Sequence, residues 1–433
     1  MFAYYFRLAL RSFGRNKVLT ALMVLAIGLG IGAAMTTLTV FKVLSGDPIP
    51  SKSDRLFYVQ VDPYPLKDFV PGEEPEPQLT RLDARQLLEQ AKAPRQAAMA
   101  GGRPIIAASD STLSPFRLSA RYTSADFFPM FEVPLAAGRA WSREEDAARA
   151  RVAVISRSLA EKLFGTVQAI GRSVQVDSHV LEVIGVTDDW HLQPKFYDLH
   201  SGSYGDPEEV LVPLWTALEL KLGRTGMTNC FGDAGVVDTT AETAPCSWLQ
   251  YWVELDAASD ADEFKAYLGN YSEQQRAAGR FERPANTRLR NVMEHLEHHD
   301  VVPGDVRLQM WLAFGFLLVC LVNTVGLLLA KFLRRSGEIG VRRALGASRA
   351  EIFKQCLVEA GTIGLAGGLV GLLLSLLGLW AVRQRPTDYA ALAQLDLPML
   401  LLTFVLAIGA SLLAGILPAW RAMRITPAIQ LKS

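Results

Sequence analysis

The stretch VLTALMVLAIGLGIGAAMTTLTVFKV, residues 18–43, decides the structural class of this chain of 433 residues. It carries no charge before Lys42, and about 20 apolar residues are enough for a helix to cross the hydrocarbon core of a bilayer. Three further segments of the same kind follow, at 311–330, 356–382 and 399–417. Because lipid offers no hydrogen bonds to the backbone, each segment should be helical. The sequence therefore predicts four transmembrane helices.

The first apolar segment has one alternative interpretation, a cleaved signal peptide. Arg7, Arg11, Arg15 and Lys17 precede it, as basic residues precede a signal peptide. The apolar region of a signal peptide spans about 7–15 residues, however, and this one is far longer. We therefore expect an uncleaved helix, and both interpretations place the following residues outside the cytoplasm.

Basic residues orient the chain in the membrane. They precede the first apolar segment, fill the connection between the second and third, and follow the fourth. These three regions lie on one face, which the positive-inside rule makes cytoplasmic. The sequence thus predicts cytoplasmic segments at 1–17, 334–355 and 419–433, transmembrane helices at 18–44, 308–333, 356–382 and 398–418, a large outer domain at 45–307 and a short outer loop at 383–397.

The outer domain mixes strands and helices without a regular alternation of the two, which predicts an α+β fold. Strands are expected at 56–61, 152–155, 174–176, 181–186, 210–214 and 248–255, and helices at 82–92, 159–164 and 262–276. Gly28, Gly30 and Gly32, with a second group of glycines between 361 and 371, suggest close contact between membrane helices, although glycine is also ordinary in such helices.

Several functions are disfavoured by composition and by missing motifs. Lys plus Arg and Asp plus Glu both number 44, so the net charge suggests no nucleic-acid partner. The 433 residues contain no P-loop, no G-x-S-x-G and no kinase signature. Glu359 is the rare ionisable residue in the apolar segments, and an arginine of the adjoining loop can neutralise it. We therefore expect a non-catalytic chain whose energy comes from a partner.

Two groups of side chains in the outer domain have ligand or redox chemistry. Cys230 and Cys246 lie where disulfides are permitted, and we expect them to be bonded, with two free thiols as the alternative. His295, His298 and His299 belong to the cluster at 294–300 and are weak candidates for a zinc or copper site. The cluster matches no metalloprotease motif, and polar turns beside a membrane helix are routine, so no metal site is predicted.

The connection between the second and third apolar segments reads RRSGEIGVRRALGASRAEI, residues 334–352. Gly346 permits a turn and Ser348 can cap the helix that follows. A short helix held between two membrane helices suits contact with a cytosolic partner. The alternative is a basic loop that only sets topology.

This connection resembles that of the permease subunits of MacB/FtsX/LolC-type (type VII) ABC transporters. The resemblance rests on E-I-G-V-R-R-A-L-G-A-S-R-x-x-I at 338–352, on Glu359-Ala360 and on the ending at 417–428. The outer domain is similar to the MacB periplasmic core at 124–128, 154–165, 169–172 and 211–215. The stretch 188–246, apart from 211–215, and the histidine cluster have no counterpart that we match.

The resemblance implies a membrane subunit that works by mechanotransmission in the bacterial inner membrane. A separate cytosolic ATPase would bind ATP and Mg²⁺, and this chain would need no cofactor. The ATPase-coupling residues it implies are Glu338, Ile339, Val341, Arg342, Arg343, Leu345, Gly346, Ala347 and Arg349. It also implies a dimer with a second copy or a paralogue, and an export role. MacB-like systems often add a periplasmic adaptor and an outer-membrane channel.

Two other hypotheses remain at this point. A ligand-sensing receptor, or an FtsX-like regulator of a periplasmic enzyme, would use the outer domain as a sensor, but a receptor should carry a cytoplasmic output domain. A membrane enzyme would need a nucleophile or a metal, and only the histidine cluster offers one. The substrate, the dimer type and the role of the cluster do not follow from the sequence.

Overall fold

The computed structural model describes residues 2–67, 69–108, 114–231, 235, 238–385 and 393–424. The chain divides into two units, one formed by residues 1–46 and 302–433 and the other by residues 47–301. The ending at 425–428 that contributes to the family resemblance lies outside the described residues, as do parts of the predicted outer loop and tail.

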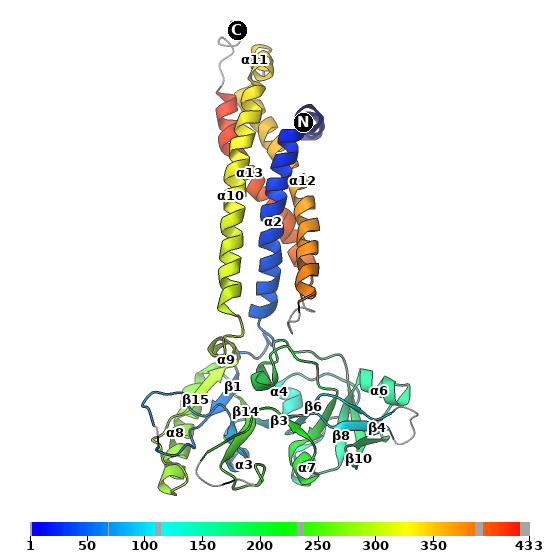
Figure 1. The fold of residues 1–433 in the computed structure, drawn as a ribbon, viewed down its shortest axis with the longest axis vertical. Helices are drawn as coiled ribbons and strands as arrows, with labels where there is room; N and C mark the ends of the chain where they lie inside the picture. The colour runs from blue at the N-terminus through cyan, green and yellow to red at the C-terminus, as the bar shows by residue number, and fades with distance from the viewer. Residues whose placement is uncertain are drawn as a thin grey trace. The chain divides into compact units, whose positions relative to one another are not determined.

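The first unit is a bundle of long helices, as predicted. Four helices in the described part of the chain are long and apolar enough to cross a membrane: α2 (Lys17–Ser45), α10 (Gly304–Arg334), α12 (Arg349–Arg383) and α13 (Leu397–Met423). They lie side by side in Figure 1, with α2 against both α10 and α12. Two shorter helices, α1 (Phe2–Arg15) and α11 (Ser336–Ala344), belong to the same unit.

Glycines let the bundle helices approach closely. A Cβ atom placed on Gly28 of α2 would lie 2.7 Å from Val370 of α12, and one on Gly367 of α12 would lie 2.7 Å from Ile27 of α2. Real Cβ atoms essentially never come that close to another heavy atom. These positions therefore require glycine for packing, and the glycine pattern marks a helix interface.

The second unit contains a mixed sheet of fifteen strands among the described residues. The strands are β1 (Leu56–Gln60), β2 (Leu79–Thr80), β3 (Arg95–Gly102), β4 (Ile105–Ala108), β5 (Phe116–Arg117), β6 (Ala120–Thr123), β7 (Leu135–Gly138), β8 (Val152–Ser156), β9 (Ser173–Val176), β10 (His179–Thr187), β11 (Val210–Pro213), β12 (Arg224–Thr225), β13 (Asn229–Cys230), β14 (Cys246–Glu254) and β15 (Arg288–Asn291).

The strand order is β15-β1-β14-β3-β6-β11-β8-β10-β9-β4-β5, with β2, β7, β12 and β13 paired off this path. Pairs β8–β10 and β6–β11 are parallel, whereas β14 is antiparallel to both β1 and β3. Parallel and antiparallel pairs in one sheet confirm the predicted α+β class.

The sheet carries apolar cores on both of its faces. Alternation along β1 places Phe57 and Val59 in one core, and Leu56 and Tyr58 in the other. The helices of this unit are α3 (Arg81–Gln90), α4 (Phe127–Met130), α5 (Arg143–Ala147), α6 (Arg157–Phe164), α7 (Leu214–Glu219), α8 (Ala261–Ala277) and α9 (Val292–His298), with 3-10 turns η1 (Phe196–Ser201) and η2 (Ala258–Asp260).

The stretch that the family resemblance left unmatched is held by buried charges. Arg121 of β6 bonds Asp198 at 2.7 Å and Glu208 at 2.5 Å, and Lys195 bonds Glu208 at 3.0 Å. Burial alone would raise the pKa of Glu208, but Arg121 and Lys195 outweigh it and lower that pKa to about 2. The segment 195–208 is therefore fixed to the sheet by ion pairs with balanced charge.

Candidate functional site

The connection between α10 and α12 folds into the short helix and turn that the sequence predicts. Helix α11 follows directly on α10, and Gly346 then adopts a φ of +101°, a conformation that favours glycine. Ser348 caps α12: its hydroxyl accepts from the Glu351 amide at 3.2 Å, while the Glu351 carboxylate accepts from the Ser348 amide at 2.8 Å. The segment is thus an ordered element of the bundle.

Glu359 of α12 is the centre of a buried ion cluster beside this segment. Its carboxylate lies 2.8 Å from the Lys331 ammonium and 3.0 Å from the Arg335 guanidinium. The hydroxyl of Ser12, on α1, donates to it at 2.5 Å. One carboxylate therefore joins three parts of the chain: α1, the end of α10 and α12.

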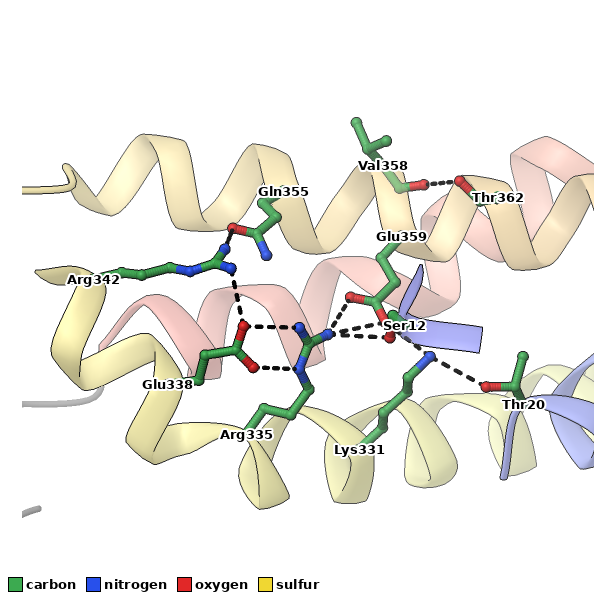
Figure 2. Close-up of polar contacts among 10 residues, drawn as sticks. All are labelled: Ser12, Thr20, Lys331, Arg335, Glu338, Arg342, Gln355, Val358, Glu359 and Thr362. Carbon is green, nitrogen blue, oxygen red and sulfur yellow. Dashed lines mark hydrogen bonds and ion pairs between the residues drawn. The ribbon is translucent and has the colours of Figure 1, made fainter. Parts of the chain in front are cut away.

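The cluster continues into α11, as Figure 2 shows. Arg335 also bonds Glu338 at 3.2 Å, and Glu338 accepts from Arg342 at 2.9 Å. Arg342 in turn donates to Gln355 of α12 at 2.7 Å. An unbroken chain of polar contacts therefore runs from α11 to the interior of the bundle.

Burial makes this cluster sensitive to the loss of any one charge. Lys331 is 0% exposed and Glu359 is 3% exposed. The Lys331 ammonium also donates to Thr20 of α2 at 3.4 Å and lies 5.6 Å from the centre of the Phe13 ring. Removing one member of a buried ion pair typically costs about 3–5 kcal/mol, because the other charge is left unpaired. The pairing thus links the end of α10 to α12, and the bond between Arg335 and Glu338 extends this link to α11.

The nine predicted coupling residues divide into an inner and an outer set. Ile339 is buried in the bundle core and Ala347 packs against it. Glu338 and Arg342 are engaged in the ion cluster, while Arg343 donates to the Met423 carbonyl of α13 at 3.5 Å.

The outer set consists of exposed residues. Val341 is 53% exposed and Leu345 is 83% exposed, and Gly346 and Arg349 are exposed as well. Two large apolar side chains, one on α11 and one at its C-cap, are a surface suited to contact with another protein.

The sequence pointed to an arginine partner for Glu359, and the structure supplies Arg335. It did not identify Lys331, which lies inside α10, as a second partner. Ser12 was missed because α1 was not expected to be a helix. A signal was present: Phe2, Tyr5, Phe6, Ala9 and Phe13 repeat at the spacing of one helix face.

The structure joins Cys230 and Cys246, the pair for which the sequence predicts a disulfide. They are opposite one another in the pairing of β13 with β14. Residues 232–234, 236 and 237 of the loop that this bond closes lie outside the described residues. Cys320 and Cys356 are free and buried.

The histidine cluster gathers around α9. The rings of His295 and His299 are 4.6 Å apart, and His200 lies 5.5 Å from His299. Burial lowers the pKa of His295 well below its usual range and lowers that of His299 to about 4. In the part of the chain that the structure describes, no group of three or more His, Cys, Asp or Glu side chains is placed to hold a metal ion. His298 lies 3.9 Å from Glu74.

Comparison with known families assigns the chain. The family model of the MacB-like periplasmic core domain matches residues 20–271, more than half of the sequence. The chain belongs to the MacB-like family. The model of the FtsX-like permease C-terminal region matches residues 310–427, so α11 and the charged members of the ion cluster, Lys331, Arg335 and Glu359, fall in the permease part of this MacB-like chain, whereas Ser12 precedes it.

Curated relatives agree with the family models. The chain is 25% identical to the "Macrolide export ATP-binding/permease protein MacB" of Azoarcus sp. over 99% of its own length and 59% of that protein. It is 26% identical to the protein of the same name from Wolinella succinogenes, over 72% of this chain and 43% of that protein. The chain thus spans about half the length of the curated relatives it matches.

Among solved structures, the periplasmic region of MacB from Actinobacillus actinomycetemcomitans aligns with 61% of this MacB-like chain and 100% of its own, at 13% identity and a TM-score of 0.38. The family and the four apolar helices together make this a membrane protein of the MacB/FtsX permease type with a periplasmic domain.

Proposed function

We propose that this chain is the transmembrane subunit of an ABC transporter and that α11 receives the force of a separate cytosolic ATPase. The observation that carries this proposal is the combination of outward-facing Val341 and Leu345 with the buried ion cluster behind them. The first gives a partner an apolar surface to bind. The second connects that surface to the membrane helices.

The contacts support a mechanism of mechanotransmission. A displacement of α11 reaches α12 through Arg342 and Gln355, and through the Arg335 bonds to Glu338 and Glu359. It reaches α10 through the backbone, because Arg335 separates the two helices by a single residue. ATP and Mg²⁺ would be bound and used by the ATPase, and this chain would convert its closure into movement of the helices and of the periplasmic domain.

The remaining parts of the proposal follow from the family and from the charge pattern. The positive-inside rule places both termini and α11 in the cytoplasm and the domain 47–301 in the periplasm of a bacterial inner membrane. A second copy or a paralogue would complete the transporter, and the relatives named for macrolide export favour an export role, for which we propose the periplasm as the source. A periplasmic adaptor and an outer-membrane channel are further candidate partners.

Affinity purification of the full chain from its native membranes in mild detergent tests the proposal. We expect a stoichiometric P-loop ATPase to co-purify with the wild type, and Val341→Asp and Leu345→Asp to lose it because a charge replaces an exposed apolar contact. Val180→Asp is the matched control, since Val180 is 54% exposed in the periplasmic domain and Val341 is 53% exposed.

Retention of the ATPase by both α11 variants would contradict the assignment of α11. Absence of any ATPase from the wild type, even with a non-hydrolysed ATP analogue present, would favour a ligand-sensing receptor or a regulator of a periplasmic enzyme instead.

A further inference from the structure

A cavity of about 600 Å³ lies in the periplasmic domain, apart from the ion cluster and the histidine cluster. Its walls come from α3, β6, α7 and β12 and include Arg81, Tyr122, Trp215 and Arg224. Leu218 and Leu222 add apolar surface. The volume is in the range of sites that enclose small organic molecules.

The cavity has an excess of positive charge. Among the described residues, Arg81, Arg149, Lys221 and Arg224 line it, against the carboxylates of Glu219 and Asp238. The Glu219 carboxylate is bonded to Arg149 at 2.8 Å. The Asp238 carboxylate accepts from the Thr240 amide at 2.8 Å and from the Thr240 hydroxyl at 2.7 Å. Both carboxylates therefore already have partners.

Arg224 is a partly buried cation in the wall of this cavity. Its Nη2 donates to the Thr228 hydroxyl at 3.0 Å, and its guanidinium lies over the Trp248 ring at 4.2 Å. Its Nε is buried without a hydrogen-bond partner, and among the described residues no carboxylate contributes to its pKa shift. Burial lowers the pKa of Arg224, so the protein holds a cation here at a cost in solvation.

Arg81 repeats the arrangement on another wall of the cavity. Its Nη1 donates to the Thr240 carbonyl at 2.8 Å, and its guanidinium lies 5.7 Å from the centre of the Trp215 ring. Its Nε is also buried without a hydrogen-bond partner in the described part of the chain. Two guanidinium groups, each beside an indole ring, thus line a single cavity.

We propose that this cavity binds a soluble organic anion, with a carboxylate, sulfonate or phosphate group at the arginines and an apolar body against Trp215 and the leucines. Guanidinium donors match the oxygens of such anions in geometry and charge. A bound anion would pair with the guanidinium groups and would compensate the partly buried charge of Arg224. Because anion binding can be measured without any ATPase, the test of this site is independent of the test of the proposed transport function.

Isothermal titration calorimetry on the full chain in phosphatidylcholine nanodiscs tests the proposal. The probe is naphthalene-2-sulfonate, and naphthalen-2-ylmethylammonium carries the same ring with the opposite charge. We expect the wild type to bind the sulfonate and not the ammonium. Arg224→Gln should weaken sulfonate binding by about tenfold or more, since loss of a desolvated charge partner is costly.

Three controls test whether the sulfonate binds at this cavity and at Arg224. Arg276→Gln removes the same charge from the surface of α8, where Arg276 is half-exposed and paired with Glu273, and should leave binding unchanged. Arg224→Lys keeps the charge and should bind more tightly than Arg224→Gln, while near-ultraviolet circular dichroism verifies that both variants fold. Phosphatidylglycerol added to the nanodiscs should not compete.

The proposal is overturned if the wild type fails to bind the sulfonate at millimolar concentration, binds both probes equally, or binds as tightly after Arg224→Gln. Competition by phosphatidylglycerol would assign the site to a lipid headgroup and overturn the proposal of a soluble ligand.

Discussion

Replacing Glu359 by glutamine should loosen the junction between α10, α11 and α12. The substitution leaves Lys331, which is 0% exposed, facing a neutral amide. Breaking a buried pair in this way costs about 3–5 kcal/mol. We take the lower end, about 3 kcal/mol, because Arg335 keeps its bond to Glu338 and the amide oxygen can still accept a hydrogen bond. A free-energy change of about 1.4 kcal/mol changes an equilibrium constant tenfold. The fraction of molecules in which the contacts between α10, α11 and α12 are broken, the open state, should therefore rise roughly a hundredfold.

The chain provides its own probe for this opening. Cys356 is free, buried and almost one helical turn before Glu359 on α12. In a Cys320→Ala background, an uncharged maleimide should label Cys356 in Glu359→Gln roughly a hundredfold faster than in the wild type, if closing outpaces labelling. Labelling in denaturing detergent gives the intrinsic reaction rate for each variant.

Two comparisons make this prediction specific. Cys320 in a Cys356→Ala background lies eleven residues before Lys331, about 16 Å along α10, and its labelling should not change. Lys331→Met combined with Glu359→Gln removes both charges and should restore most of the protection. The ion pair does not hold the junction if Cys356 is labelled at the same rate in Glu359→Gln and in the wild type. The same conclusion follows if Cys356 is labelled as fast in the double variant as in Glu359→Gln.

Three further predictions concern other parts of the chain. Cys230→Ser should lower the free energy of unfolding of the periplasmic domain by about 3 kcal/mol, because the disulfide closes a loop with a sequence separation of 16. Urea unfolding of the variant and of the wild type, with and without reductant, measures this difference. Equal midpoints for the variant and the oxidised wild type would contradict the prediction. Burial raises the pKa of Asp146 from 3.8 to about 7, so the folded state keeps a proton that the unfolded chain has released. The stabilisation by protonated Asp146 is present below pH 3.8 and is lost as the pH rises through about 7. Asp146→Asn should therefore reduce the difference in Tm between about pH 5 and about pH 8. An unchanged difference would refute the raised pKa of Asp146. Gly364→Ala would place a Cβ 2.6 Å from the Ser411 Cβ and should lower stability in detergent by about 1–3 kcal/mol. Thermal unfolding can detect a loss of this size. A Tm equal to that of wild type would show that α12 and α13 can separate there.

The sequence predicts the membrane helices well because a long apolar run has few alternatives to a helix. It predicts their ends less well. Helix α12 begins at Arg349 rather than at 356, because the capping box at Ser348 starts the helix before the apolar residues do. Helix α10 begins at Gly304 rather than 308, and the periplasmic unit ends at Val301 instead of 307. Hydropathy reports where lipid begins, whereas helix ends depend on caps.

The strands with strong apolar patterns are also predicted closely. The expected strand at 210–214 ends at Pro213, after which Leu214 begins α7. Strands β3 and β6 were not predicted. Strand β3 reads RQAAMAGG, whose small residues lack the β-branched signal, and its burial comes from its neighbours β14 and β6. Tertiary contacts, which local sequence does not encode, decide such strands.

The ion cluster shows where sequence reasoning about the site stops and what the structure adds. Lys331 and Glu359 are 28 positions apart, and the packing of α10 and α12 against the same helices, α2 and α13, brings them together. Once assembled, the cluster lies at the one residue that separates α10 from α11, where a push on α11 could otherwise be absorbed by bending. Coupling between sites in proteins typically amounts to about 1–3 kcal/mol, less than the cost of breaking a buried ion pair. A displacement of α11 that changes the free energy by that amount should therefore move α11, α10 and α12 together without breaking the junction. An element that transmits movement requires this property.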